Sequence, residues 1–316
     1  MLPLSRARRP VLLIVGCGDV GLRVLRLVRR RFRVLALTSS PARLHALRQA
    51  GALPLVGDLD DPASLGRLAA LADCVLHLAP PPGRGTTDPR THHLLQALAR
   101  SARVRRIVYA STSGVYGDAA GQRFDETRAV RPATDRGCRR VDAEARVRHH
   151  GRAFGVRVSV LRVPGIYALD RMDGDPRERV RRGSPVLAPD DDVYTNHIHA
   201  DDLAGACVAA LTRGAPQRVY HVSDNSEMKM GEHFDAVADA FGLPRPPRLS
   251  REEASRTLSP MQMSFLAESR RLDNRRLREE LRLRLRYPTP ATAWATALAP
   301  AAQCPSPPGD DDRAAR

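Results

Sequence analysis

Lysine, aromatic residues and paired cysteines are all scarce in this sequence of 316 residues. Lys229 is the only lysine, so arginine carries almost all of the positive charge behind the formal net charge of +16. Aromatic residues make up only 4%, too few for the stacked rings with which RNA-binding modules hold bases. The arginines are spread over nearly every segment, so we expect no specific nucleic-acid partner and only salt-sensitive nonspecific adhesion.

The five cysteines form no C-x-x-C pair and no short disulfide framework, which is typical of a protein of the reducing cytoplasm. The first apolar run, Val11 to Val15, is far too short for a signal peptide or a membrane span. We therefore expect a cytoplasmic protein with no membrane partner.

Short runs rich in valine, isoleucine and leucine alternate with amphipathic segments over the first half of the chain. This alternation predicts an α/β fold with a doubly wound parallel sheet, the Rossmann type, followed by a small C-terminal substrate lobe. The predicted strands are 11–15, 33–38, 53–58, 74–79, 106–112 and 157–163. The predicted domains are a basic extension (1–10), a dinucleotide-binding domain (11–165), the interleaved last strands with the lobe (166–299) and a disordered tail (300–316).

A glycine motif, G-C-G-D-V-G at 16–21, follows the first predicted strand and opens a helix. In that context the glycines permit a tight turn and a close approach of a pyrophosphate to the backbone N–H groups at the helix start. Strand, turn and helix in this order predict dinucleotide binding by Gly16, Gly18, Asp19, Val20 and Gly21.

The second strand ends in Thr38, Ser39 and Ser40, where an NAD site usually places an acidic residue for the ribose 2′-hydroxyl. Those hydroxyls and Arg43 suit a 2′-phosphate instead, so NADP is the expected cofactor and NAD the alternative; Arg43 also fits a plain surface residue. The ends of the next two strands are expected to line the rest of the cofactor path, with Asp58, Leu59, Leu78, Ala79 and Pro80.

Three later motifs carry a resemblance to a known family: YASTSGVYGD (109–118), VLRVPGIYALDR (160–171) and HIHADDLAGA (197–206). With the glycine motif, they resemble the extended short-chain dehydrogenase/reductases, the NAD-dependent epimerase/dehydratase group. The resemblance covers roughly Val11 to Leu298. It implies an NAD(P)-binding oxidoreductase or isomerase that acts on a nucleotide-sugar-like or other small carbonyl or hydroxyl substrate.

The resemblance also exposes a departure in ATDRGCRRVDAE (133–144), a predicted helix capped by Thr134 or Asp135. The family carries Tyr-x-x-x-Lys here, and this chain has Arg136 in the tyrosine position and Arg140 in the lysine position. Arginine holds anions and riboses but does not donate a proton near neutral pH. We expect Arg140 at the nicotinamide ribose and Arg136 at an anionic substrate; the alternative is a solvated basic stripe.

Other catalytic candidates are few. Thr112 occupies the family's serine or threonine position, and Tyr116 is either a replacement acid or part of a structural V-Y-G turn. Ser113 and Gly114 stand where sugar 4,6-dehydratases carry an Asp-Glu pair, which disfavours that reaction. No metal site is expected: His197, His199 and Asp201 are interpreted as a structural junction, with Asp202 capping a helix from Leu203.

Two functions follow: an atypical reductase or epimerase, or a noncatalytic NADP-binding sensor or scaffold. Helices near 90–101 and 136–150 match the pair that often dimerises in the family. The second carries five arginines whose burial would be costly, so we expect a monomer or a weak homodimer. These are Arg136, Arg139, Arg140, Arg146 and Arg148.

Overall fold

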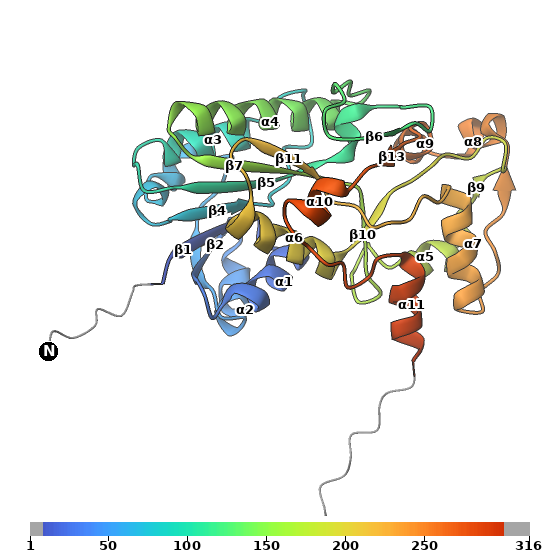
Figure 1. Ribbon diagram of the computed structural model, residues 1–316, viewed down its shortest axis with the longest axis horizontal. Coiled ribbons are helices and arrows are strands. Elements are labelled where there is room, and N and C mark those ends of the chain that lie inside the picture. The colour runs from blue at the N-terminus through green and yellow to red at the C-terminus, as the bar shows by residue number, and fades with distance from the viewer. Residues whose placement is uncertain (1–8, 300–316) are drawn as a thin grey trace, which may run out of the picture.

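A seven-stranded parallel sheet forms the centre of the computed structural model, which describes residues 9–299 (Figure 1). The strand order is β11-β7-β5-β4-β1-β2-β3. All six predicted strands are present, and β3 and β4 each end two residues earlier than expected. The strands are β1 (Val11–Val15), β2 (Arg33–Thr38), β3 (Leu53–Val56), β4 (Cys74–His77), β5 (Arg106–Thr112), β7 (Arg157–Val163) and β11 (Arg218–His221).

Helices cover both faces of this sheet because alternate strand residues point to opposite sides. Leu12 and Ile14 of β1 pack in one apolar cluster with α1 and α6, whereas Leu13 packs in the other with α3 and α4. The predicted doubly wound architecture is confirmed. The helices are α1 (Asp19–Val28), α2 (Leu44–Gln49), α3 (Pro89–Leu98), α4 (Asp135–Ala153) and α6 (Ala200–Arg213).

A smaller lobe lies beyond the carboxyl ends of the strands and contains most of the chain after β7 (Figure 1). Three two-stranded sheets pair distant segments in it. They join β8 (Gly165–Tyr167) to β10 (His197–His199), β9 (Val186–Leu187) to β12 (Arg248–Leu249), and β6 (Arg123–Phe124) to β13 (Arg271–Leu272). The lobe's helices are α5 (Pro176–Arg181), α7 (Met230–Ala240), α8 (Arg251–Thr257), α9 (Pro260–Leu266), α10 (Arg275–Glu279) and α11 (Pro290–Leu298).

The junction between β10 and α6 differs from the expected one. The helix begins at Ala200 instead of Leu203, and its cap is His199, whose Nδ1 accepts the backbone N–H of Asp201 at 3.2 Å. The Asp202 carboxylate instead accepts the backbone N–H groups of Arg286 (2.7 Å) and Tyr287 (2.8 Å). The predicted capping role of Asp202 was wrong because the strand runs directly into the helix, and Asp202 fastens the C-terminal segment.

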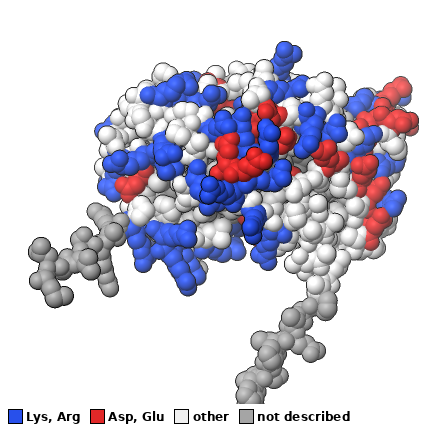
Figure 2. All heavy atoms as spheres, in the orientation of Figure 1, with Lys and Arg blue, Asp and Glu red and all other residues white. Residues whose placement is uncertain are grey.

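Basic and acidic side chains are interspersed over the visible face of the molecule (Figure 2). Among residues 9–299, no helix is long and apolar enough to cross a membrane. The expected N-terminal extension lies mostly outside the described residues, and the expected tail lies wholly outside them.

Candidate functional site

The glycine loop between β1 and α1 is shaped to admit a ligand. Gly16 has φ +83°, and a Cβ there would lie 2.4 Å from the backbone nitrogen of Ala79, so only glycine fits. A Cβ on Gly18 would meet no atom of residues 9–299 within 4 Å. Gly18 is also the N-cap of α1 and supplies no side-chain cap, so the N–H groups at this helix start are available to a phosphate.

The rest of the motif supports this loop. Gly21 allows α1 to approach Cys17, whose Sγ would lie 3.2 Å from a Cβ at that position, and Val20 packs against the core. Asp19 is neutralised by ion pairs with Arg23 (3.1 Å) and Arg171 (3.2 Å). Its charge therefore does not oppose an anionic ligand at the loop.

A cavity of about 210 Å³ adjoins the loop at the ends of β2 and β3. Arg43 reaches over it and donates from Nη2 to the Cys17 carbonyl at 2.7 Å. Sequence reasoning missed Arg90, which also lines the cavity and pairs with Asp60 at 2.6 Å. The expected cofactor residues that line it are Gly16, Thr38, Ser39, Arg43, Asp58, Leu59, Ala79 and Pro80.

Of the residues expected at the strand ends, Ser40 and Leu78 do not line this cavity, and neither do the expected Gly18, Asp19, Val20, Gly21 and Arg140. The backbone N–H of Ser40 donates to the Thr38 hydroxyl at 3.2 Å, which closes the turn after β2. Leu78 donates its N–H to the Val15 carbonyl at 2.8 Å and packs against the core. Ser40 therefore supports the turn beside the cavity through its backbone, and Leu78 supports the neighbouring core.

A larger cleft of about 810 Å³ opens beside the cofactor cavity, and Pro80 lines both. Thr112, at the end of β5, lines the cleft, and its hydroxyl accepts the N–H of Gly114 at 3.2 Å. The opposite wall comes from the lobe and includes Phe265 and Glu268. The cleft thus joins the sheet's carboxyl edge, where α/β folds bind ligands, to the lobe.

Helix α4 presents three arginines to this cleft, and Thr134 caps it as expected by accepting the N–H of Gly137 at 3.1 Å. The Arg136 guanidinium lies 4.5 Å from the centre of the Phe265 ring, and burial lowers the pKa of Arg136. Arg140 also lines the cleft, and its expected contact with a nicotinamide ribose stays a prediction. Its Nη1 donates to the Tyr109 hydroxyl (3.0 Å) and to the Ala110 carbonyl (2.8 Å), which fastens it to β5.

Arg139 is the cleft residue that sequence reasoning assigned to a dimer face. It is only 7% exposed and donates from Nη1 to the Gly85 carbonyl at 2.5 Å. Its Nε is buried and has no hydrogen-bond partner among the described residues. The signal that could have found it is its position three residues after Arg136, which places the two side chains on one face of the helix.

Tyr116 lies outside the cleft, in a buried network behind β5. Its hydroxyl is 2.6 Å from Nη1 of Arg162 and 2.5 Å from Nε2 of His221, and burial raises its pKa to about 12. Arg162 also forms an ion pair with Glu144 at 2.7 Å. The structure therefore does not support Tyr116 as a replacement acid, and the tyrosine is structural.

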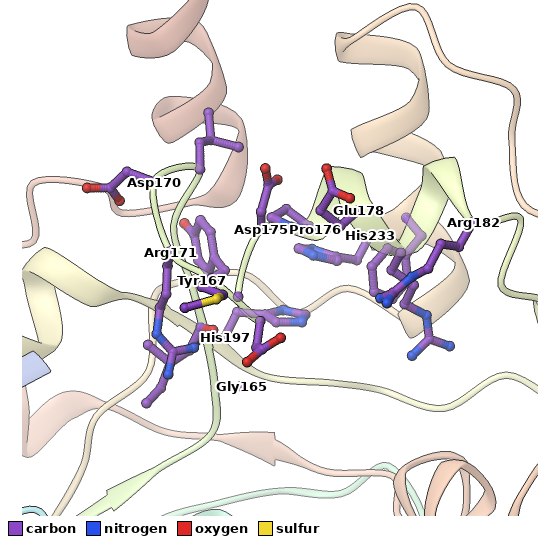
Figure 3. A pocket seen from close by; sticks show the side chains of 17 residues that line it. Gly165, Tyr167, Asp170, Arg171, Asp175, Pro176, Glu178, Arg182, His197 and His233 are labelled. Carbon is purple, nitrogen blue, oxygen red and sulfur yellow. Dashed lines mark hydrogen bonds between the residues drawn. The ribbon is translucent and has the colours of Figure 1, made fainter. Parts of the chain in front are cut away.

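A second cavity, of about 750 Å³, continues from the cleft toward α5 (Figure 3). The rings of His197 and His233 stack there with centres 3.9 Å apart, and burial lowers the pKa of His197 to about 4. Arg179 also lines it, and its Nε has no hydrogen-bond partner within residues 9–299. Residues 9–299 contain no group of three or more histidine, cysteine or acidic side chains that could hold a metal.

Comparison with known proteins extends these observations. Residues 16–214 match the model of a family described as NAD(P)H-binding. The chain is 26% identical over 267 residues to the dTDP-glucose 4,6-dehydratase of Mycolicibacterium smegmatis, covering 72% of this chain and 80% of that protein. It is 28% identical over 247 residues to Protein YeeZ of Escherichia coli K12, covering 74% and 84%.

Solved structures share the whole fold. A functionally unknown conserved protein from Silicibacter pomeroyi has a TM-score of 0.78 and 28% identity, covering 91% of this chain and 97% of that one. The UDP-glucose 4-epimerase of Thermotoga maritima, solved with UDP-glucose, has a TM-score of 0.71 and 18% identity, covering 90% and 95%. The latter likeness shows the fold alone.

Proposed function

We propose that this chain, which belongs to the NAD(P)-binding extended short-chain dehydrogenase/reductase family, the epimerase/dehydratase group, exchanges hydride between NADP(H) and a small nucleotide-sugar-like molecule. One observation carries the proposal: the glycine-loop cavity and the cleft meet at Pro80, with Thr112 lining the cleft. A cofactor in the first cavity would thus reach a substrate in the second.

The choice of NADP rests on the cavity beside β2. Thr38 and Ser39 supply hydroxyls there, and Arg43 supplies a guanidinium with no ion-pair partner among residues 9–299. A 2′-phosphate provides that missing anion, whereas NAD offers only a neutral hydroxyl. Asp58 also lines the cavity, but its Oδ1 is occupied by the backbone N–H of Asp60 at 2.9 Å.

Titration of NADPH and NADH into the purified protein tests the cofactor. We expect tighter binding of NADPH, and an Arg43→Ala variant should lose about tenfold or more of that affinity while NADH binding changes little. Arg48→Ala is the matched control, because Arg48 is an exposed arginine of the adjoining helix α2. An NADH preference that Arg43→Ala leaves unaltered would remove the 2′-phosphate argument.

The proposed substrate class is supported by the charge of the cleft. Arginines line it from α4, from α5 and from the segment after α9, and guanidinium groups match phosphate oxygens in geometry. The relatives that carry a substrate in their names are nucleotide-sugar enzymes. A diphosphate-bearing sugar therefore fits both the cleft and the family.

A noncatalytic NADP-binding role is the second candidate, and one observation favours it. The helix face that would carry the tyrosine acid has Arg136, and Arg140 is fastened to β5, so neither offers a proton near neutral pH. Purified protein with NADPH, screened against nucleotide sugars and simple ketones for cofactor oxidation, separates the two roles. Oxidation that depends on a substrate supports the enzyme, while tight NADPH binding with no oxidation by any of them supports the sensor or scaffold.

A further inference from the structure

The cleft contains more positive charge than its own acidic residues neutralise. Of the arginines that line it, Arg171 pairs with Asp19 at 3.2 Å and Arg270 pairs with Glu268 at 2.5 Å. The others have no carboxylate within ion-pair distance among residues 9–299. These are Arg136, Arg139, Arg140 and Arg179.

These unpaired guanidinium groups divide between two walls. Arg179 lies on α5 and also lines the second cavity, which Figure 3 shows. Its guanidinium carbon lies 4.7 Å from the centre of the Phe234 ring. Arg136, Arg139 and Arg140 lie on α4, at the end of the cleft that holds Thr112. One anionic group on a ligand can neutralise only one of these walls.

The α4 wall has the stronger need for an anionic partner. Arg139 is buried and donates only to the Gly85 carbonyl, and its Nε has no hydrogen-bond partner among residues 9–299. Arg136 is exposed at the cleft, stacks on Phe265 and donates no hydrogen bond to any described residue. Arg139 is thus a desolvated cation without an acidic partner among the described residues, which is costly, so an anionic group of a ligand beside it would lower that cost.

We infer that the substrate carries a second acidic group, a carboxylate in the sugar portion, which Arg136 and Arg139 bind beside Thr112. The inference rests on the proposed nucleotide-sugar-like substrate, whose diphosphate then faces Arg179 at the opposite wall. The substrate class is therefore a nucleotide-linked acidic sugar. Arg140 acts as a positioning residue that holds its end of the helix wall against β5.

The test uses two probes that differ by one carboxylate, UDP-glucose and UDP-glucuronate, titrated into protein saturated with NADP⁺. We expect UDP-glucuronate to bind about tenfold more tightly, because a bidentate guanidinium–carboxylate contact is worth about that factor. Arg136→Gln should abolish the preference, and Arg136→Lys should keep part of it. Arg152→Gln, an exposed arginine in the last turn of α4, should keep all of it.

Equal affinities in the unaltered protein, or a preference that survives Arg136→Gln, would overturn the inference and leave the proposed function standing. If neither nucleotide binds while NADP⁺ does, the nucleotide-sugar assignment fails. Titration with inorganic phosphate then tests whether Arg136 and Arg139 form an anion site. Phosphate should then bind more weakly to Arg136→Gln and Arg139→Gln than to Arg152→Gln. Equal phosphate binding by all three variants rejects the site, and bound NADP⁺ in each variant confirms that it is folded.

Discussion

Gly16 and Gly18 stand two residues apart in the cofactor loop, yet their substitution should have opposite consequences. Gly18→Val places its side chain where no protein atom lies within 4 Å of the Cβ, so we expect an unchanged melting temperature and loss of NADP(H) binding. Gly16→Val meets the Ala79 backbone at 2.4 Å in a positive-φ conformation, so it should destabilise the fold itself. Thermal denaturation with and without NADPH separates the two; retained NADPH binding in Gly18→Val would contradict a pyrophosphate site at this glycine.

Asp224 gives a pH dependence with a defined sign. Its Oδ2 is buried and has no hydrogen-bond partner in the described part of the chain, and burial raises its pKa to about 7, against about 3.9 in an unfolded chain. Between these values the native state keeps a proton that the unfolded state has lost, so this group's contribution to stability falls as pH rises through that window.

Asp224→Asn removes that titration. Relative to the unaltered protein, the variant's free energy of unfolding should rise between pH 5 and pH 7 by at most about 1.4 kcal/mol per pH unit. Asp190→Asn, an exposed control, should show no such trend. Denaturant titrations across that range measure both, and a flat difference for Asp224→Asn would contradict the prediction.

For single residues, the sequence predicted which side chains line the cleft better than it predicted the partners that they contact. Thr112 and Arg136 line the cleft as expected, because strand ends and helix faces follow from periodicity. The partner of Arg140 could not be predicted, since it depends on how α4 lies against Tyr109 in β5. The unpaired state of Arg139 likewise emerges only when every nearby carboxylate has a position.

Helix α4 is fastened to the sheet by a buried ion pair. Glu144 accepts two hydrogen bonds from Arg162 of β7, at 3.1 and 2.7 Å, and one from the Ser111 hydroxyl at 2.6 Å. Both charged side chains are at most 5% exposed, so neither charge can be solvated if its partner is lost. The pair therefore fixes how α4 lies against the sheet, although its net contribution to stability is small.

We expect Glu144→Ala to lower the free energy of unfolding by about 3–5 kcal/mol, because it leaves Arg162 buried and unpaired. Glu144→Leu combined with Arg162→Met should recover much of that loss by replacing both charges with apolar groups. Glu252→Ala breaks an exposed pair with Arg256 and should cost less than about 1 kcal/mol. A double variant no more stable than Glu144→Ala alone would show that the pair is needed for more than charge compensation.

The central strands were predictable because buried parallel strands are continuous apolar runs. The lobe's strands β8, β9 and β12 were not, since they have only two or three residues each and show no periodicity. Their pairing joins segments far apart in the chain, such as Val186 with Arg248. The start of α6 was missed for a related reason: β10 leaves no loop in which a conventional cap could stand.

For the whole molecule, the structure changes the argument about assembly. Three of the five arginines expected on the dimer face, Arg136, Arg139 and Arg140, line the cleft instead, and Arg146 pairs with Asp142 at 2.8 Å. The outer face of α3 and α4 instead has an apolar hollow of about 510 Å³ beside Phe154, which is 56% exposed. The cost of burying those three arginines therefore no longer applies to this face.

We still expect no more than a weak homodimer, because this hollow is small and is bordered by Arg146 and His149. Phe154→Glu should make the protein monomeric at every concentration without lowering its melting temperature. Light scattering over a concentration series measures this, with Leu298→Glu as an exposed apolar control remote from the hollow. A tight dimer that persists in Phe154→Glu would place the interface elsewhere.

The contacts of Arg140 with β5 bear on how the family's pair can be rebuilt at this site. One nitrogen, Nη1, donates to both the Tyr109 hydroxyl at 3.0 Å and the Ala110 carbonyl at 2.8 Å. A lysine ammonium also carries several donors on one nitrogen, so a lysine Nζ in the place of Nη1 would keep both partners. Position 109 therefore needs no change when Arg136→Tyr and Arg140→Lys restore the family's pair.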